Sequence, residues 1–171
     1  MGFSSARKPS IAFTALACLV IAASPKAADP STVTTTFTVS TDVQTACVVS
    51  ATALNFGAYI TTAASNATST ITVQCNNLTT YNIGLDQGTS PGATTTTRAM
   101  TGPTGAVPLG YSLCSDSASC AKNWGDVVGT DTVPGTGNGS GQPYTVYGHI
   151  PAGEVSRAGA YSDTITVTVT F

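Results

Sequence analysis

Charged side chains are scarce in this sequence and make up only 8% of its 171 residues, against roughly 25% in an average soluble domain. Lysine and arginine together number six, histidine occurs once, and the formal net charge is −2. A nucleic-acid-binding surface needs clustered basic residues, so the composition excludes that class. The shortage of Glu, Lys, Leu and Arg also argues against coiled coils and helical bundles.

Residues typical of β-strands are abundant instead. Thr, Val, Ile, Tyr and Phe occur in short runs that are separated by many of the 17 glycines and 9 prolines. Such runs, bounded by turn residues, are typical of strands. The composition therefore predicts an all-β protein.

The first 28 residues have the pattern of a Sec signal peptide. Arg7 and Lys8 precede the uncharged, mostly apolar run 11–24, which is shorter than the roughly 20 residues of a membrane-spanning helix. We expect cleavage after Ala27 or Ala28, with an uncleaved anchor or a buried core helix as the alternatives. No other segment is long and apolar enough to span a membrane, so we expect an exported protein with no integral membrane segment in its mature chain.

Four of the five cysteines remain after the signal peptide, which fits an oxidising destination. They are Cys47, Cys75, Cys114 and Cys120, and four cysteines allow three pairings. Proximity in the sequence favours Cys114–Cys120, which leaves Cys47–Cys75. A zinc site is the competing interpretation, but the spacing lacks a C-x-x-C pair and the chain has a single histidine.

Alternating apolar and polar residues predict about seven short strands. They are expected at residues 32–49, 54–59, 68–75, 81–88, 98–100, 144–150 and 161–171. The Gly-rich stretch 127–143 is expected to be an exposed loop. No segment after the signal peptide repeats with the period of a helix. The pattern predicts an immunoglobulin-like β-sandwich.

The two ends of the mature chain are unusual. The last expected strand has one apolar face, made by Ile165, Val167, Val169 and Phe171, and nothing follows it that could pair with its free side. The first expected strand carries Val33, Thr35, Phe37 and Val39 on one face. It can pair with the last strand of the same molecule, or it can leave and pair with a different molecule.

Seven blocks of sequence resemble the spore coat protein U domain family. They are STDVQTAC (40–47), LNFGAY, TSTITVQCNN, YNIGLDQG, YSLCSDSASCAKNWGD, VYGHIPAGE and AGAYSDTITVTVTF. Together, and in this order, they cover residues 40–171. Pilus members of the family are subunits of archaic chaperone–usher pili of the kind that form biofilms. Its first member is a sporulation coat protein.

The resemblance implies an incomplete immunoglobulin-like fold that lacks its last strand. Residues 29–42 would be a donor strand, with Val33, Thr35, Phe37 and Val39 facing the groove of another subunit, and 43–171 would be the pilin domain. A periplasmic chaperone and an outer-membrane usher are the implied partners, besides other subunits in a head-to-tail polymer. The groove would be lined by Ile165, Val167, Val169 and Phe171, with the Phe171 carboxylate held by the chaperone. Cys47–Cys75 would match the family's bridge between its first two strands.

The resemblance further implies a structural subunit of the shaft or a minor position, exported to the cell surface for attachment and biofilm formation. The alternative is a secreted spore-coat-like or carbohydrate-binding module that folds completely as a monomer. We expect no catalytic residue, cofactor or metal. No G-x-S-x-G elbow accompanies His149, which is expected on a polar strand face or as a hydrogen-bonded partner. Asp126 and Asp163 are expected at turns or caps, and Trp124 is expected to be a packing anchor.

Overall fold

The computed structural model describes residues 30–171, and the expected signal peptide lies outside them. The chain divides into two units, one ending at Thr41 and one spanning Asp42–Phe171. All the strands belong to the second unit. They are β1 (Cys47–Ala51), β2 (Ser65–Cys75), β3 (Thr80–Leu85), β4 (Arg98–Met100), β5 (Leu109–Cys114), β6 (Val133–Thr136), β7 (Gln142–Ile150) and β8 (Val167–Thr170). Residues 30–171 contain no helix.

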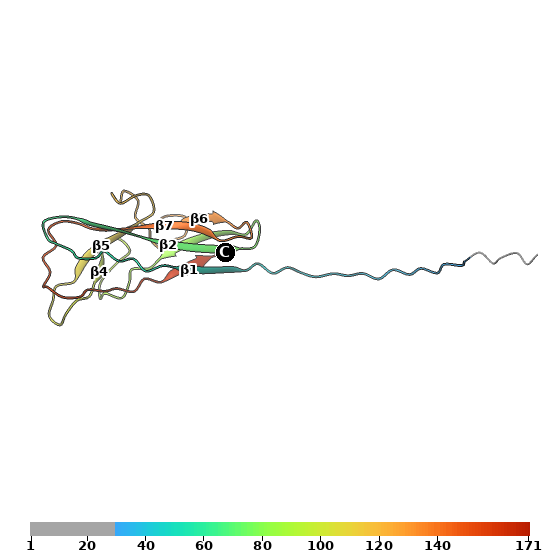
Figure 1. Cartoon of the computed structure of the whole chain (residues 1–171), viewed down its shortest axis with the longest axis horizontal. Helices are drawn as coiled ribbons and strands as arrows, with labels where there is room; N and C mark the ends of the chain where they lie inside the picture. Colours follow the sequence, from blue (N-terminus) through green and yellow to red (C-terminus); the bar gives the residue numbers. More distant parts are fainter. Residues whose placement is uncertain (1–29) are drawn as a thin grey trace, which may run out of the picture. The chain divides into compact units, whose positions relative to one another are not determined.

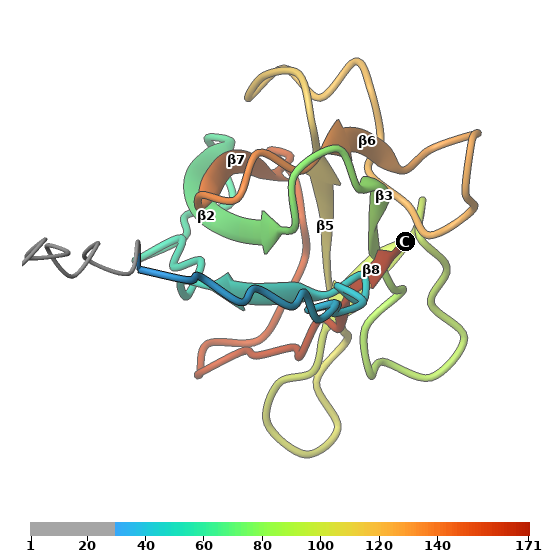
Figure 2. The same cartoon turned by 90° about the vertical axis from the view of Figure 1, so that its right-hand side faces the viewer.

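The eight strands form two sheets in which every pairing is antiparallel (Figures 1 and 2). One sheet has the order β1–β2–β7–β5–β4, and the other has the order β6–β3–β8. Some strands that are adjacent in the sequence, such as β7 and β8, belong to different sheets. The prediction of an all-β sandwich is confirmed.

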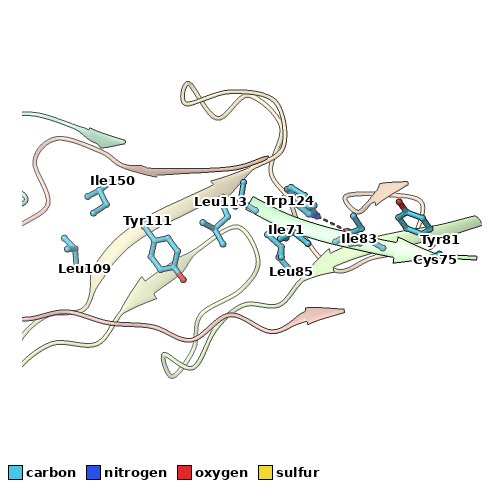
Figure 3. Close-up of a cluster of buried hydrophobic side chains, with 12 residues drawn as sticks. Ile71, Cys75, Tyr81, Ile83, Leu85, Leu109, Tyr111, Leu113, Trp124 and Ile150 are labelled. Atoms are coloured by element: carbon cyan, nitrogen blue, oxygen red, sulfur yellow. Dashed lines mark hydrogen bonds between the residues drawn. The ribbon is translucent and has the colours of Figure 1, made fainter. Parts of the chain in front are cut away.

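The core lies between the two sheets, where the alternating residues of β2, β3, β5 and β7 meet (Figure 3). Its buried members include Ile71, Val73, Tyr81, Ile83, Leu85, Leu109, Tyr111, Leu113, Val146 and Ile150. Trp124 is also buried, and its indole N–H donates a 2.8 Å hydrogen bond to the carbonyl oxygen of Ile83. Trp124 is therefore a packing anchor, as predicted.

A buried arginine fixes the ends of several segments beside this core. Arg98 in β4 is 1% exposed. Its guanidinium donates to the carbonyl oxygens of Asp86, Thr95, Leu85 and Trp124 at 2.7–2.8 Å. Burial lowers the pKa of Arg98 from its usual value. The side chain joins the sheet that contains β4 to the end of β3 in the other sheet.

Two of the predicted strands at the front of the chain are wrong or shortened. Residues 30–46 form no strand, because an extended segment needs a neighbour for its backbone groups before it becomes part of a sheet. Residues 54–59 are irregular as well. The Asn55 side chain accepts a hydrogen bond from the N–H of Gly57, whose φ is +68°, and this local turn interrupts the extended run.

Two predictions near the back of the chain are also corrected. The expected loop 127–143 contains β6, which pairs with β3. Gly135 allows this because a Cβ there would collide with the ring of Tyr81 and the hydroxyl of Tyr144. The expected last strand is shorter than predicted. Before Val167 the side chain of Asp86 accepts the N–H of Thr166, so side-chain bonds replace part of the ladder.

Both predicted disulfides are present. Cys47–Cys75 joins β1 to β2 at residues that are directly opposite in the register. Cys114–Cys120 closes the short loop that follows β5. All four cysteines of residues 30–171 are therefore paired.

Candidate binding groove

A large cleft opens along one side of the sandwich within the unit Asp42–Phe171. Its volume is about 1040 Å³. One wall is the segment that continues from β1, residues 51–61, and the other is the segment that leads into β8, residues 154–167. Core side chains form the floor. They are Ile71, Leu85, Met100, Leu109, Tyr111, Leu113, Val146 and Ile150. The hydrophobic core thus lies directly beneath this cleft.

The cleft lies where both sheets have an edge. Strand β1 is the edge of the five-stranded sheet and β8 is an edge of the three-stranded sheet. The two strands approach each other on the same side of the sandwich. Among the described strands, β1 pairs only with β2, and β8 pairs only with β3. Each strand therefore has one side whose backbone groups can pair with an added strand.

The first wall is held by packing rather than by a sheet ladder. Leu54 and Phe56 lie over Gly148 of β7, where a Cβ would be too close to both side chains. The Phe56 ring meets the Tyr111 ring edge to face, with centroids 6.3 Å apart. The Tyr59 hydroxyl donates to the carbonyl oxygen of Pro151 at 2.8 Å. These contacts place apolar side chains along the wall without using its backbone.

The second wall is held by a carboxylate. One oxygen of Asp163 accepts the Tyr111 hydroxyl at 2.7 Å, and the other accepts both the N–H and the hydroxyl of Thr89 at 2.8 Å. The same oxygen accepts the N–H of Thr164 at 2.8 Å. Burial alone would raise the pKa of Asp163, but these hydrogen bonds outweigh it, and the pKa lies below its usual value. Asp163 is therefore ionised near neutral pH.

The predicted groove residues differ in where they lie. Ile165 and Val167 line the cleft. Val169 is half-buried and packs against the core beyond the cleft. Phe171 is 57% exposed at the end of the chain. The apolar face expected for the last strand thus points inward from Ile165 to Val169 and becomes exposed at its final residue.

The predicted donor residues belong to the other unit, which is described by itself. Val33, Phe37 and Val39 are 95%, 86% and 83% exposed, and Thr35 is exposed too. Apolar side chains of this size are normally buried in a soluble protein. The segment 30–41 therefore presents three large apolar groups on alternate residues of a chain that forms no strand of its own.

The remaining polar candidates form no reactive cluster. His149 shares a 2.7 Å hydrogen bond with the Asn66 side chain on the outer face of the β2–β7 pair, and Asp126 is exposed. Residues 30–171 contain no group of three or more side chains suited to bind a metal ion. Nor does this part of the chain include a helix with the length and hydropathy that crossing a membrane requires.

Sequence reasoning missed three residues that hold the cleft wall or the core beside it. Asp163 was expected only at a turn or cap, whereas it joins three segments. Asp86 and Arg98 were given no role. No local pattern marks Arg98, because arginine side chains are usually exposed and its partners at residues 85, 86 and 124 lie in other segments. Nothing local distinguishes Asp163, since its partners at residues 89 and 111 are distant in the sequence.

Comparisons with known proteins agree with this fold. The family description Spore Coat Protein U domain matches residues 33–168. Protein U of Myxococcus xanthus is 33% identical over 182 residues, which cover 98% of this chain and 99% of that protein. A solved chain is similar with a TM-score of 0.57 and 27% identity. It belongs to the CsuC–CsuE chaperone–tip adhesion subunit pre-assembly complex from the archaic chaperone–usher Csu pili of Acinetobacter baumannii. The match covers 75% of this chain and 40% of that one.

Proposed function

Because the chain belongs to the Spore Coat Protein U domain family, we propose that it is a structural subunit of a chaperone–usher pilus. The subunits of this pilus polymerise by donor-strand exchange, and the fibre serves surface attachment and biofilm formation. The observation that carries this proposal is the cleft, whose floor is made of core side chains and whose walls continue from the edge strand β1 and lead into the edge strand β8. The apolar face of a sheet is stable when another element covers it, and an added strand supplies that cover here.

The cleft suits one added strand. Such a strand pairs with the free side of β8 and extends the three-stranded sheet, while its inward side chains fill the space above Leu85 and Tyr111. Backbone hydrogen bonds supply affinity in this mode of recognition, and pockets for alternate side chains supply specificity. The occupant is therefore an extended segment with large apolar groups on alternate residues.

Residues 29–42 of a second copy are the proposed occupant, and 43–171 are the domain that accepts it. Val33, Phe37 and Val39 become buried, with Thr35 between them as the smallest inward group. Burying three such side chains contributes roughly 5–9 kcal/mol before ordering costs. Each subunit uses one surface to donate and a different one to accept, so the contact is head-to-tail. A head-to-tail contact that does not close gives a filament.

The free edge of β8 also explains which partners the subunit needs before it joins the fibre. A periplasmic chaperone supplies a temporary strand to the cleft and holds the Phe171 carboxylate, and an outer-membrane usher then exchanges that strand for the next subunit. The exposed Phe171 at the chain end is accessible for such a contact. In this proposal residues 1–28 direct export through the Sec pathway, and the mature protein reaches the cell surface.

A second candidate is a secreted, spore-coat-like module that acts as a complete monomer. The similarity to Protein U over almost its entire length favours it. The two candidates differ in what the cleft requires. A pilus subunit needs a strand from another molecule, whereas a complete monomer needs none.

The test compares two variants of the donor segment that carry the same new charge. Phe37→Asp places a carboxylate on the inward row, and Thr36→Asp places one on the opposite row of the same segment. Burying an unpaired charge in an apolar cleft costs several kcal/mol, so fibres seen by electron microscopy should vanish for Phe37→Asp and persist for Thr36→Asp. Fibres of normal length from Phe37→Asp would refute the donor assignment. A natural chain that stays monomeric and stable without a chaperone would favour the coat module.

A further inference from the structure

The cleft wall that leads into β8 has little sheet pairing of its own. Between Glu154 and Thr166 it forms one isolated bridge, in which Ser162 pairs with Thr101. Thr166 also forms two hydrogen bonds with Asp86. Its N–H donates to the Asp86 side chain, and its carbonyl oxygen accepts the Asp86 N–H. A segment with so few ladder bonds would be expected to move. Something other than a sheet must therefore hold it beside the open cleft.

Asp163 supplies three of the hydrogen bonds that hold this wall, and its partners come from both sides of the sandwich. Tyr111 belongs to β5 in the five-stranded sheet and lines the cleft floor. Thr89 lies in the loop after β3, in the other sheet. The carboxylate thus joins the wall to the floor and to the neighbouring loop through three hydrogen bonds of 2.7–2.8 Å. Hydrogen bonds to a charged group are stronger than neutral ones.

The loop after β3 is shaped to receive this carboxylate. Gly88 has a φ of +83°, a conformation that favours glycine. A Cβ at Gly88 would overlap the carboxyl group of Asp163. The absence of a side chain there is what lets the carboxylate reach Thr89. Two features of distant segments, a glycine and a tyrosine hydroxyl, therefore converge on one side chain.

We infer that Asp163 is a positioning residue for donor-strand binding, an inference that rests on the proposed function. It holds the accepting wall in the geometry that a donor strand needs while the cleft is still empty. Ordering a loop on binding weakens affinity, and a wall that is already ordered avoids that loss. Removing the carboxylate leaves Tyr111 and Ile165 in place as apolar lining but frees the wall to move.

The test measures binding of a fluorescent peptide with the sequence of residues 30–42 to the exported chain. The chain carries Phe37→Asp, so that its own donor segment cannot enter the clefts of other copies. The substitution leaves its own cleft unchanged. Asp163→Asn in this background should weaken peptide binding by about 10- to 100-fold. Asp116→Asn is the matched control. Asp116 also accepts a backbone N–H, from Lys122, but it lies in the disulfide loop and does not line the cleft, so its variant should bind like the parent.

Tyr111→Phe keeps the ring in the cleft floor and removes only its hydroxyl, and it covers the case in which Asp163→Asn folds poorly. It should weaken binding by a smaller factor, and it should add nothing when combined with Asp163→Asn. The two outcomes that matter are separable. If the peptide does not bind even when Asp163 is intact, the proposed function fails. If it binds the parent, Asp163→Asn and Tyr111→Phe equally, only the positioning role of Asp163 is refuted.

A pH profile separates positioning from a general loss of stability. The groups that face Asp163 are the Tyr111 hydroxyl and Thr89, with Arg98 and Asp86 behind Tyr111. The affinity of the parent for the peptide should fall as acid protonates Asp163, and that of Asp163→Asn should show no such step. Parallel profiles for both chains would overturn the inference.

Discussion

Moving the donor segment to the other end of the chain tests whether the cleft is a missing strand. The variant places residues 29–42 behind Phe171 through a short flexible linker, so that the segment can enter the cleft of its own molecule. Phe171 ends the segment that forms one edge of the cleft. The relocated strand therefore has only a short distance to travel, and closing a loop of a few residues costs little.

The size of the effect follows from the three exposed side chains. Val33, Phe37 and Val39 are all more than four-fifths exposed in the natural chain. Their burial contributes roughly 5–9 kcal/mol in gross terms. If one third survives the cost of ordering the strand, roughly 2–3 kcal/mol remains, which raises the melting temperature of a domain of this size by roughly 6–15 °C.

Thermal melts and size-exclusion chromatography decide the outcome. The relocated chain should be monomeric and should melt well above the natural chain measured without a chaperone. Phe37→Asp in the relocated strand should abolish the increase, and Thr36→Asp should keep most of it. Equal melting temperatures for monomeric natural and relocated chains would mean that the natural fold is already complete.

Three further predictions concern groups outside the donor segment. Cys47→Ser should reduce the exported amount more than Cys114→Ser, because the chain-entropy estimate is about 3.5 kcal/mol for the longer loop and about 2.5 kcal/mol for the shorter one; immunoblots of exported protein check this, and an inverted order contradicts it. Arg98→Met should destabilise the fold by about 2 kcal/mol or more in urea, because it leaves buried carbonyl oxygens of Leu85 and Trp124 without donors; an unchanged midpoint would show that other donors replace the guanidinium. The pKa of Asp163 is lowered in the folded chain, so its contribution to stability is complete above its usual pKa and is lost as the pH falls through the lower folded value. Urea midpoints should therefore fall in acid below about pH 4, and by less in Asp163→Asn than in the unsubstituted chain.

Much of the sheet content could be predicted because it depends on local alternation. Ile71, Val73 and Cys75 alternate with polar residues in β2, and Val146 and Ile150 do so in β7. One face of each strand meets the core, so the period of two is visible in the sequence. The disulfide Cys114–Cys120 was predictable for a related reason, since a separation of six residues leaves few alternatives.

The strand predictions failed in two situations. In one, apolar and polar residues alternate but no neighbouring strand is present, and in the other, a neighbouring strand is present but the residues do not alternate. Residues 32–46 alternate well but form no strand in a single chain, because strand formation depends on a partner for the backbone. Residues 133–136 lack the pattern but form β6, because Gly135 fits against the ring of Tyr81 and the hydroxyl of Tyr144. Neither outcome can be read from one segment alone.

The sequence by itself determined that the chain is an all-β sandwich with two disulfides and an apolar stripe at each end, because these properties follow from the order of neighbouring residues. Only the tertiary structure decided that a cleft lies over the core beside the edge strands β1 and β8, and that one carboxylate holds the wall of that cleft. The partners of Asp163 lie 52 and 74 residues away along the chain. Such contacts arise from the packing of two sheets, and no local pattern encodes them.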